Sequence, residues 1–207
     1  MIPNLSSLLE LSSSRHSHLC PRQVLGVRMG LAGLEVLGVK VPVTKLTALV
    51  IVETDSCFAD GIEVSTGTTV GHRTLRVNDM GKIAATFVNV KTGRAMRISP
   101  VLDVRQHAPI YAPHEKCHYF AQLEGYQVMP EQELFRFQEV ILQPSLNAIL
   151  SKPGMPVKCN NCGEEIINER EQIVNGTVLC RACANQGYYL SRPARVEICA
   201  IMDGQPR

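Results

Sequence analysis

The sequence predicts an α+β core domain, with helices packed on a mainly antiparallel sheet, and a small separate unit after it. Segments with helical spacing come first, and a strand, a helix, further strands and a final helix follow. A stretch rich in Pro, Gly and Ser over residues 143–156 then interrupts the pattern. We therefore expect a core over residues 1–150, a linker over 151–156, a second unit over 157–190 and a tail over 191–207.

Two helices are expected at the start of the core. The first spans residues 4–11, and the second opens at Cys20-Pro21, with proline in its favoured first-turn place, and runs to about Leu37. One apolar stripe of the second helix consists of Val24, Val27, Leu31 and Leu34. Glycine lowers helix stability, so the glycines near this stripe indicate close packing against another backbone. They are Gly26, Gly30 and Gly33.

A central strand and a capped helix follow. Residues 46–53 form an apolar, β-branched run of strand length. Asp55 or Ser56 can cap the next helix, which places Cys57 in its first turn. The strands expected after this helix form an antiparallel meander over residues 75–78, 83–90 and 94–98.

The last element expected in the core is a helix. It covers residues 130–142, with Glu131 and Glu133 in its first turn. Its expected buried stripe consists of Leu134, Phe137 and Ile141.

Four cysteines in the second unit form the most specific local signal of the chain. Cys159 and Cys162 make one CxxC pair and Cys180 and Cys183 another, with 17 residues between the pairs. This spacing is typical of a four-cysteine zinc site. Between the pairs, Asn175-Gly176 predicts a type I′ hairpin turn. Two knuckles, a hairpin and a short final helix predict a treble-clef zinc finger whose zinc supplies folding free energy.

Charge and hydropathy exclude some partners. Residues 157–190 contain three Lys or Arg against four Glu, so the finger lacks the basic face of a nucleic-acid reader. The net charge of +2 gives no reason to expect a polyanionic partner. No apolar run of 18 residues exists, so no membrane span is expected. The first residues do not resemble a signal peptide. Four of the eight cysteines suit zinc, which indicates a reducing compartment, so we expect the protein in the cytoplasm.

A second group of metal-ligating residues lies in the core. His16, His18 and Cys20 occupy alternate positions, which share one side of an extended segment. Cys20 and Cys57 both stand at a helix start, where free N–H groups favour a thiolate. If Cys57 comes close, two imidazoles and two thiolates form a soft site suited to zinc or another transition metal. The alternative is a buried structural Cys57 with exposed histidines near a loop.

Several motifs of the core match one family. Residues 16–21 read His16-Ser17-His18-Leu19-Cys20-Pro21 and resemble an HGHxCPG motif. Residues 53–62 are similar to an ETDSCxxDAI block, and shorter stretches resemble TGCTxGKGN, DxGK and TGKAVR. In this order and spacing, over about residues 14–98, the motifs resemble those of the formylmethanofuran dehydrogenase FmdE family.

The resemblance implies an α+β core, usually dimeric, with a metal site near the first histidine–cysteine motif. The implied ligands are His16, His18, Cys20 and Cys57, and we expect their metal to be Zn²⁺. Asp55 and Asp60 are implied as polar site residues, and Cys20, Cys57 and Asp60 are the candidate catalytic residues. Some family members also carry a C-terminal zinc finger. The family is associated with a molybdenum or tungsten enzyme, so the chain is expected to be an accessory or catalytic partner of such an enzyme.

The chain departs from the family pattern at several positions. Ser17 and Arg22 replace glycines of the first motif, and Thr68 stands where the family often has cysteine. His72 and Arg73 replace the Lys-Gly of the GKGN stretch. These differences affect the family's chemistry more than its fold.

One further pattern imitates a metalloprotease. Residues 114–118 read His-Glu-Lys-Cys-His and fit H-E-x-x-H, which binds zinc when both histidines share a helix face. Lys116 is charged where the active-site helix is normally uncharged, and no further ligand motif follows. We therefore expect surface polar residues, with a local metal contact through His114, Cys117 or His118 as the alternative.

Three functions fit these observations. The first is a metal-dependent or thiol-dependent enzyme, or its accessory factor, with its site at Cys20 and Cys57. The second is a carrier that delivers metal, and the third is an adaptor whose finger docks a protein partner. Metal stoichiometry separates them, because an adaptor holds only the finger zinc.

Overall fold

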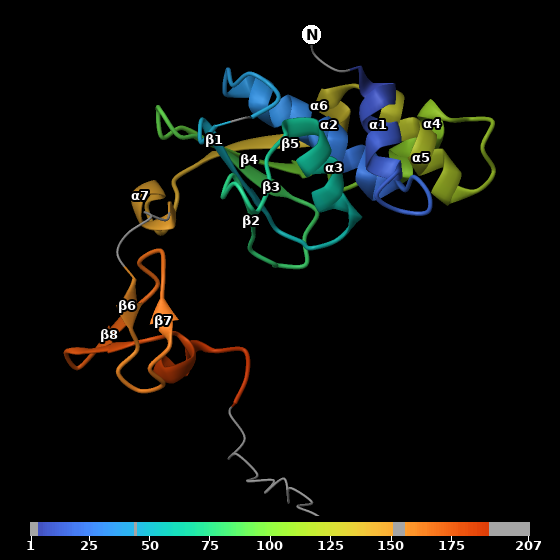
Figure 1. Ribbon diagram of the computed structural model, residues 1–207. Coiled ribbons are helices and arrows are strands. Elements are labelled where there is room, and N and C mark those ends of the chain that lie inside the picture. The colour runs from blue at the N-terminus through green and yellow to red at the C-terminus, as the bar shows by residue number, and fades with distance from the viewer. Residues whose placement is uncertain (1–3, 44, 151–155, 191–207) are drawn as a thin grey trace, which may run out of the picture. The chain divides into compact units, whose positions relative to one another are not determined.

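The structure is a computed structural model that describes residues 4–43, 45–150 and 156–190 (Figure 1). The chain divides into two compact units, Met1–Ile149 and Leu150–Arg207, and each is described by itself. The linker expected over residues 151–156, apart from Pro156, and the tail expected over 191–207 lie outside the described residues. No helix in the described part of the chain is long and apolar enough to cross a membrane.

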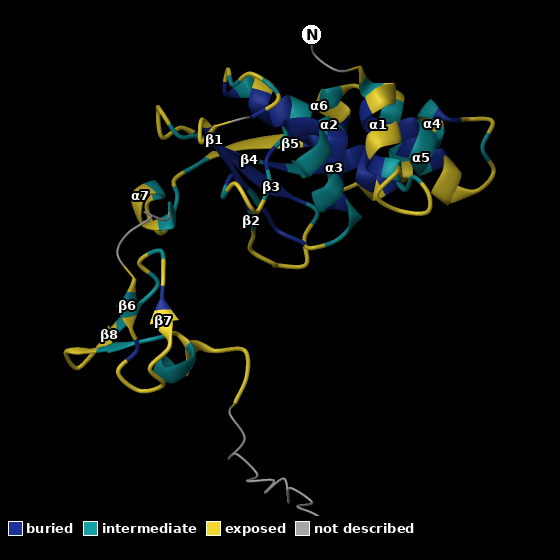
Figure 2. Cartoon of the chain, viewed as in Figure 1, coloured by how far each residue is buried: buried dark blue, intermediate teal, exposed yellow. Residues whose placement is uncertain are grey.

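The first unit is built on a five-stranded sheet in the order β2-β1-β3-β4-β5. Its strands are β1 (Ala48–Val52), β2 (Leu75–Val77), β3 (Ala85–Asn89), β4 (Ala95–Pro100) and β5 (Phe135–Val140). β1 pairs in parallel with β2, and all other neighbours pair antiparallel. The apolar strands β1 and β3 are the most buried part of the sheet (Figure 2).

The helices of this unit are α1 (Leu5–Ser13), α2 (Pro21–Val36), α3 (Cys57–Thr66), α4 (Val104–Tyr111), α5 (His118–Val128), α6 (Glu131–Leu134) and α7 (Leu146–Ile149). The predicted helices at residues 4–11 and from Pro21 to about Leu37 are confirmed as α1 and α2. Cys20 is the N-cap residue of α2, and Ser56 that of α3, so Cys57 begins α3 as expected. The mainly antiparallel α+β core is confirmed.

Helices α2 and α3 pack backbone against backbone. A Cβ added at Gly26 would lie 2.3 Å from the carbonyl oxygen of Phe58, and one at Gly61 would lie 2.5 Å from that of Gln23. A Cβ at Gly33 would meet the Phe87 ring of β3 at 2.5 Å. The prediction that the glycines of α2 mark close packing against another backbone is therefore confirmed at Gly26.

The expected meander is wrong at its first strand. β2 does not pair with β3 but lies beside β1, with Val50 opposite Leu75. A parallel neighbour requires a crossover connection, and α3 supplies it between β1 and β2. β3 and β4 do form the expected antiparallel pair.

The expected helix over residues 130–142 is also wrong. Only Glu131–Leu134 is helical, and Phe135–Val140 forms β5 along the edge of β4. Of the expected stripe only Leu134 is buried, whereas Ile141 is 98% exposed. The first residues of this segment, Phe-Arg-Phe-Gln, also alternate with the period of a strand, and pairing with β4 satisfies backbone groups along one edge of β5. Helices α4 and α5 were not predicted from the sequence.

The described part of the C-terminal unit, residues 156–190, contains two small hairpins and one short helical segment. β6 (Val157–Lys158) pairs with β7 (Glu165–Ile166), β8 (Gln172–Val174) pairs with β9 (Thr177–Leu179), and η1 (Ala182–Gln186) follows. Asn175 and Gly176 have φ values of 51° and 77°. Positive φ at both central residues is what a type I′ turn needs, so the predicted hairpin is confirmed.

Substitution of Gly26 by alanine tests the α2–α3 contact. The new methyl group would overlap the Phe58 carbonyl, so we expect unfolding free energy to fall by about 2–3 kcal/mol. Gly71→Ala is the control, because a Cβ there meets nothing within 4 Å, and its expected change is below about 0.5 kcal/mol. Urea unfolding followed by circular dichroism measures both. Equal effects of the two substitutions would contradict this account of the packing.

Candidate functional site

The four cysteines of the C-terminal unit converge on one point. Their sulfur atoms all lie within 4.8 Å of one another, and Cys162 Sγ is 3.9 Å from Cys180 Sγ. The loop of the β6–β7 hairpin carries the first pair, and the end of β9 and the start of η1 carry the second. None of the seven described cysteines forms a disulfide. Four thiols at this separation suit a closed tetrahedral zinc site.

Backbone groups prepare this cluster for a metal. The N–H of Cys180 donates to Cys159 Sγ at 3.2 Å, and N–H groups of Cys162 and Cys180 lower the pKa of Cys159 to about 6. The N–H of Glu164 lowers the pKa of Cys162, but burial and hydrogen bonds to the other thiols together raise it to about 12. Without metal the cluster thus holds protons that Zn²⁺ must displace.

The core cysteines also come together. Cys20 at the start of α2 and Cys57 at the start of α3 line the same cavity, near enough for the charge of one to shift the pKa of the other. Burial raises the pKa of the Cys20 thiol, the N–H of Gln23 opposes this rise, and the charge of Cys57 adds to it. The expected preference for a thiolate at the helix start is therefore outweighed by burial at Cys20.

A cavity of about 380 Å³ opens beside these two thiols. His18 lines it with Cys20 and Cys57, so three of the four predicted core ligands border one space. The first turns of α2 and residues of other elements complete the lining: Pro21, Arg22, Leu25, Ile83, Arg105, Tyr119, Gln122 and Tyr126. Burial raises the pKa of Tyr126 to about 12, against the opposing effect of Arg105, so this hydroxyl stays protonated at neutral pH.

The cavity residues from α4 and α5 could not be assigned from the sequence, because both helices were missed. Tyr119, Gln122 and Tyr126 follow the i, i+3, i+7 spacing of one helix face, and this signal could have revealed them. The Tyr119 hydroxyl donates to the carbonyl of Leu19 at 3.4 Å, which links α5 to the segment before α2.

The two histidines differ in their contacts. His16 Nε2 lies 2.6 Å from Asp60 Oδ2, so Asp60 holds His16 against the first turn of α3. His18 is exposed, and its Nδ1 lies 3.0 Å from the hydroxyl of Ser17. Asp55 is exposed as well. Among the described residues the core quartet does not form a group with all ligand atoms within 4.8 Å.

The H-E-x-x-H pattern does not lie on one helix. His114 is in a turn, and His118 is the first residue of α5, so the geometry of a metalloprotease motif is absent here. His114 instead forms an ion pair with Glu124 at 2.8 Å. The ligand atoms of His114, Glu115 and Glu124 lie within 4.8 Å of one another. This possible His/Glu metal site is on the surface.

The fold and these sites define an α+β protein with a cysteine-rich metal-binding unit, and the comparisons with known proteins agree. The family model described as "FmdE, Molybdenum formylmethanofuran dehydrogenase operon" matches residues 15–152. The chain therefore belongs to the FmdE family. The model of the prokaryotic dksA/traR C4-type zinc finger matches residues 156–188, which supports zinc at the four-cysteine cluster.

The chain is also similar to two individual proteins. A probable S-adenosyl-L-methionine-binding protein of Archaeoglobus fulgidus is 29% identical over 89% of this chain. The chain spans about half the length of that curated relative, with 54% covered. The crystal structure of a tungsten formylmethanofuran dehydrogenase FmdE-like protein from Syntrophus aciditrophicus matches with a TM-score of 0.56 and 20% identity, over 90% of this chain and 95% of that one. This second likeness shows the fold.

Replacement of Cys162 by serine tests the zinc finger. Loss of one thiolate opens the closed site, so we expect elemental analysis to show about one zinc fewer per chain. Because the core is a separate compact unit, its thermal unfolding followed by circular dichroism should stay unchanged. Cys117→Ser is the matched control, since Cys117 is exposed and lies outside the cluster. Unchanged zinc content in Cys162→Ser would contradict the assignment.

Proposed function

We propose that the core cavity binds a transition metal and that this site, not the finger, carries the protein's activity. The observation that supports it most is that Cys20, Cys57 and His18 line one cavity. One imidazole and two thiolates are soft ligands that suit Zn²⁺. Three protein ligands leave one coordination position open, which is the ligand count of catalytic zinc sites.

The residues present fit such a metal in their chemistry. His18 is exposed, so its side chain can rotate toward the thiols. Neither core cysteine forms a disulfide. His16, the fourth ligand predicted from the sequence, is bonded to Asp60 and acts in this proposal as a positioning residue, which keeps one coordination position open. When bound, Zn²⁺ would polarise a substrate oxygen or lower the pKa of a bound water. Arg22 and Arg105 would then stabilise negative charge in the cavity.

We further propose an accessory or catalytic role beside a molybdenum or tungsten formylmethanofuran dehydrogenase. Family membership supports this link. Asp60 is proposed as a catalytic residue with Cys20 and Cys57, through its contact with His16. We expect the protein to work as a homodimer in the cytoplasm, and sedimentation at equilibrium tests the dimer.

Two alternative functions, a metal carrier and a protein-binding adaptor, can be tested against this proposal. A metal carrier would release its core metal rapidly to a chelator, whereas a catalytic centre would exchange it slowly. An adaptor would hold only the finger zinc and use the finger to dock a protein partner. The exposed aromatic side chains of Tyr188 and Tyr189 give the finger a surface suited to such contact.

Substitution of Cys57 by serine separates these functions. We expect loss of the metal beyond the finger zinc, because a serine hydroxyl is a poor ligand for a soft site. With Co²⁺ in place of Zn²⁺, the thiolate charge-transfer absorption of the core site should disappear while that of the finger persists. Cys117→Ser keeps both signals, since Cys117 borders neither site. A single metal per chain that is insensitive to Cys57→Ser would favour the adaptor.

A further inference from the structure

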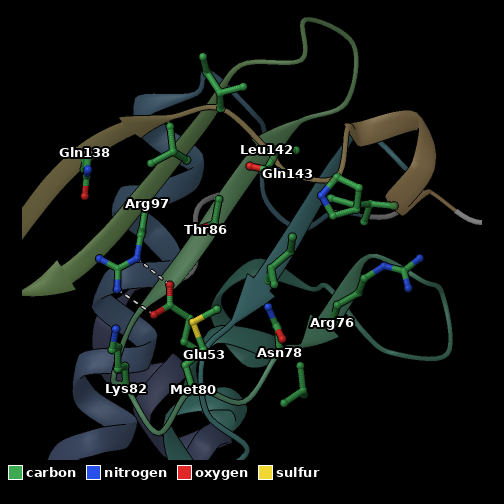
Figure 3. Close-up of a pocket in the computed structure, with 16 residues that line it drawn as sticks. Glu53, Arg76, Asn78, Met80, Lys82, Thr86, Arg97, Gln138, Leu142 and Gln143 are labelled. Atoms are coloured by element: carbon green, nitrogen blue, oxygen red, sulfur yellow. Dashed lines mark hydrogen bonds and ion pairs between the residues drawn. The ribbon is translucent and has the colours of Figure 1, made fainter. Parts of the chain in front are cut away.

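A second cavity lies on the opposite face of the sheet from α2. Side chains of consecutive strand residues point to opposite faces. Phe87 of β3 faces Gly33 of α2, so its neighbour Thr86 points to the other face, where it lines a cavity of about 610 Å³ (Figure 3). This cavity shares no lining residue with the cysteine cavity. It therefore offers a binding place independent of the proposed metal site.

A buried ion pair forms one side of this cavity. Glu53 follows β1, and its side chain is 9% exposed. Arg97 of β4 donates from Nε to Glu53 Oε1 at 2.6 Å and from Nη2 to Glu53 Oε2 at 2.8 Å (Figure 3). Both carboxylate oxygens thus accept from one guanidinium, which fixes its plane. The pair has no net charge and holds Arg97 in a defined orientation at the cavity.

Lys82 adds positive charge beside this pair. The backbone N–H groups of Met80 and Lys82 donate to the carbonyl of Glu53 at 2.9 and 3.1 Å, so the segment that carries Lys82 is attached to the end of β1. Lys82 lines the same cavity as Glu53 and Arg97, and all three are labelled in Figure 3. None of the ion pairs among the described residues includes Lys82. Glu53 is the only acid in the cavity lining that the structure describes.

Apart from the guanidinium of Arg76 on β2, the rest of the lining is mostly apolar, with a few amides. The sheet and the segment after β5 provide Ile51, Val77, Val140, Leu142, Pro144 and Ile149. Asn78, Gln138 and Gln143 provide the amides. A largely apolar pocket with a small number of convergent polar groups is typical of a small-molecule site.

We propose that this cavity binds an amphipathic organic anion, with its acidic group against Lys82 and Arg97 and its apolar body against the β1 and β5 wall. Lys82 and Arg97 beside the Glu53 carboxylate leave an excess positive charge at this end of the cavity, which an anionic group neutralises. Carboxylate, sulfonate and phosphate groups share this chemistry. The site is independent of the metal proposed for the cysteine cavity.

Binding of 8-anilinonaphthalene-1-sulfonate to the full chain tests this proposal. This probe joins a sulfonate to an apolar body, and its fluorescence rises in apolar surroundings. We expect saturable binding. Lys82→Gln should weaken it about tenfold, because the substitution removes one hydrogen bond between charged groups. Lys91→Gln removes the same charge from an exposed turn outside the cavity and should leave the affinity unchanged. Octanoate should displace the probe, and neutral octanol should not.

Other results would overturn the proposal. Equal affinities of Lys82→Gln and Lys91→Gln would show that the probe binds elsewhere, and equal displacement by octanol would show that charge is irrelevant. If Lys82→Gln shifts the oligomeric state in sedimentation and leaves probe affinity unchanged, a second copy of the chain covers this face instead. Because Lys82 is exposed, the variant should fold, and an unchanged circular dichroism spectrum verifies this.

Discussion

The close contact of α2 and α3 is the constraint on which the core site depends. Gly26 and Gly61 have no side chain to separate the two backbones, so the helices approach more closely than larger residues would allow. Cys20 lies at the start of one helix and Cys57 at the start of the other. Two residues 37 positions apart in the sequence thereby come to one cavity. The helix contact, and not a local motif, creates the pair of thiols.

The two cysteine groups have different electrostatic surroundings. In the finger, backbone N–H groups lower the pKa of Cys159 to about 6, and four thiols enclose one point. In the core, burial raises the pKa of Cys20, and two described cysteines line one cavity. The finger thus resembles a closed structural site, whereas the core thiols border an open cavity.

Local signals in the sequence predicted local structure well. Asn175-Gly176 predicted its hairpin because both residues tolerate positive φ, and the glycines of α2 predicted a close backbone neighbour. The predictions were wrong where the structure of a segment depends on which strand it pairs with. β5 fits helical and strand periods alike, and only the free edge of β4 makes it a strand. The charged cavity could not be foreseen either, because Glu53 and Arg97 meet only through the register of β1, β3 and β4.

An element-resolved anomalous diffraction map of crystals grown with zinc tests the central claim most directly. The account predicts two zinc peaks per chain, one among the four finger cysteines and one between Cys20 Sγ and Cys57 Sγ with His18 turned toward it. A map with a strong peak at the finger and none at the core thiols would contradict it.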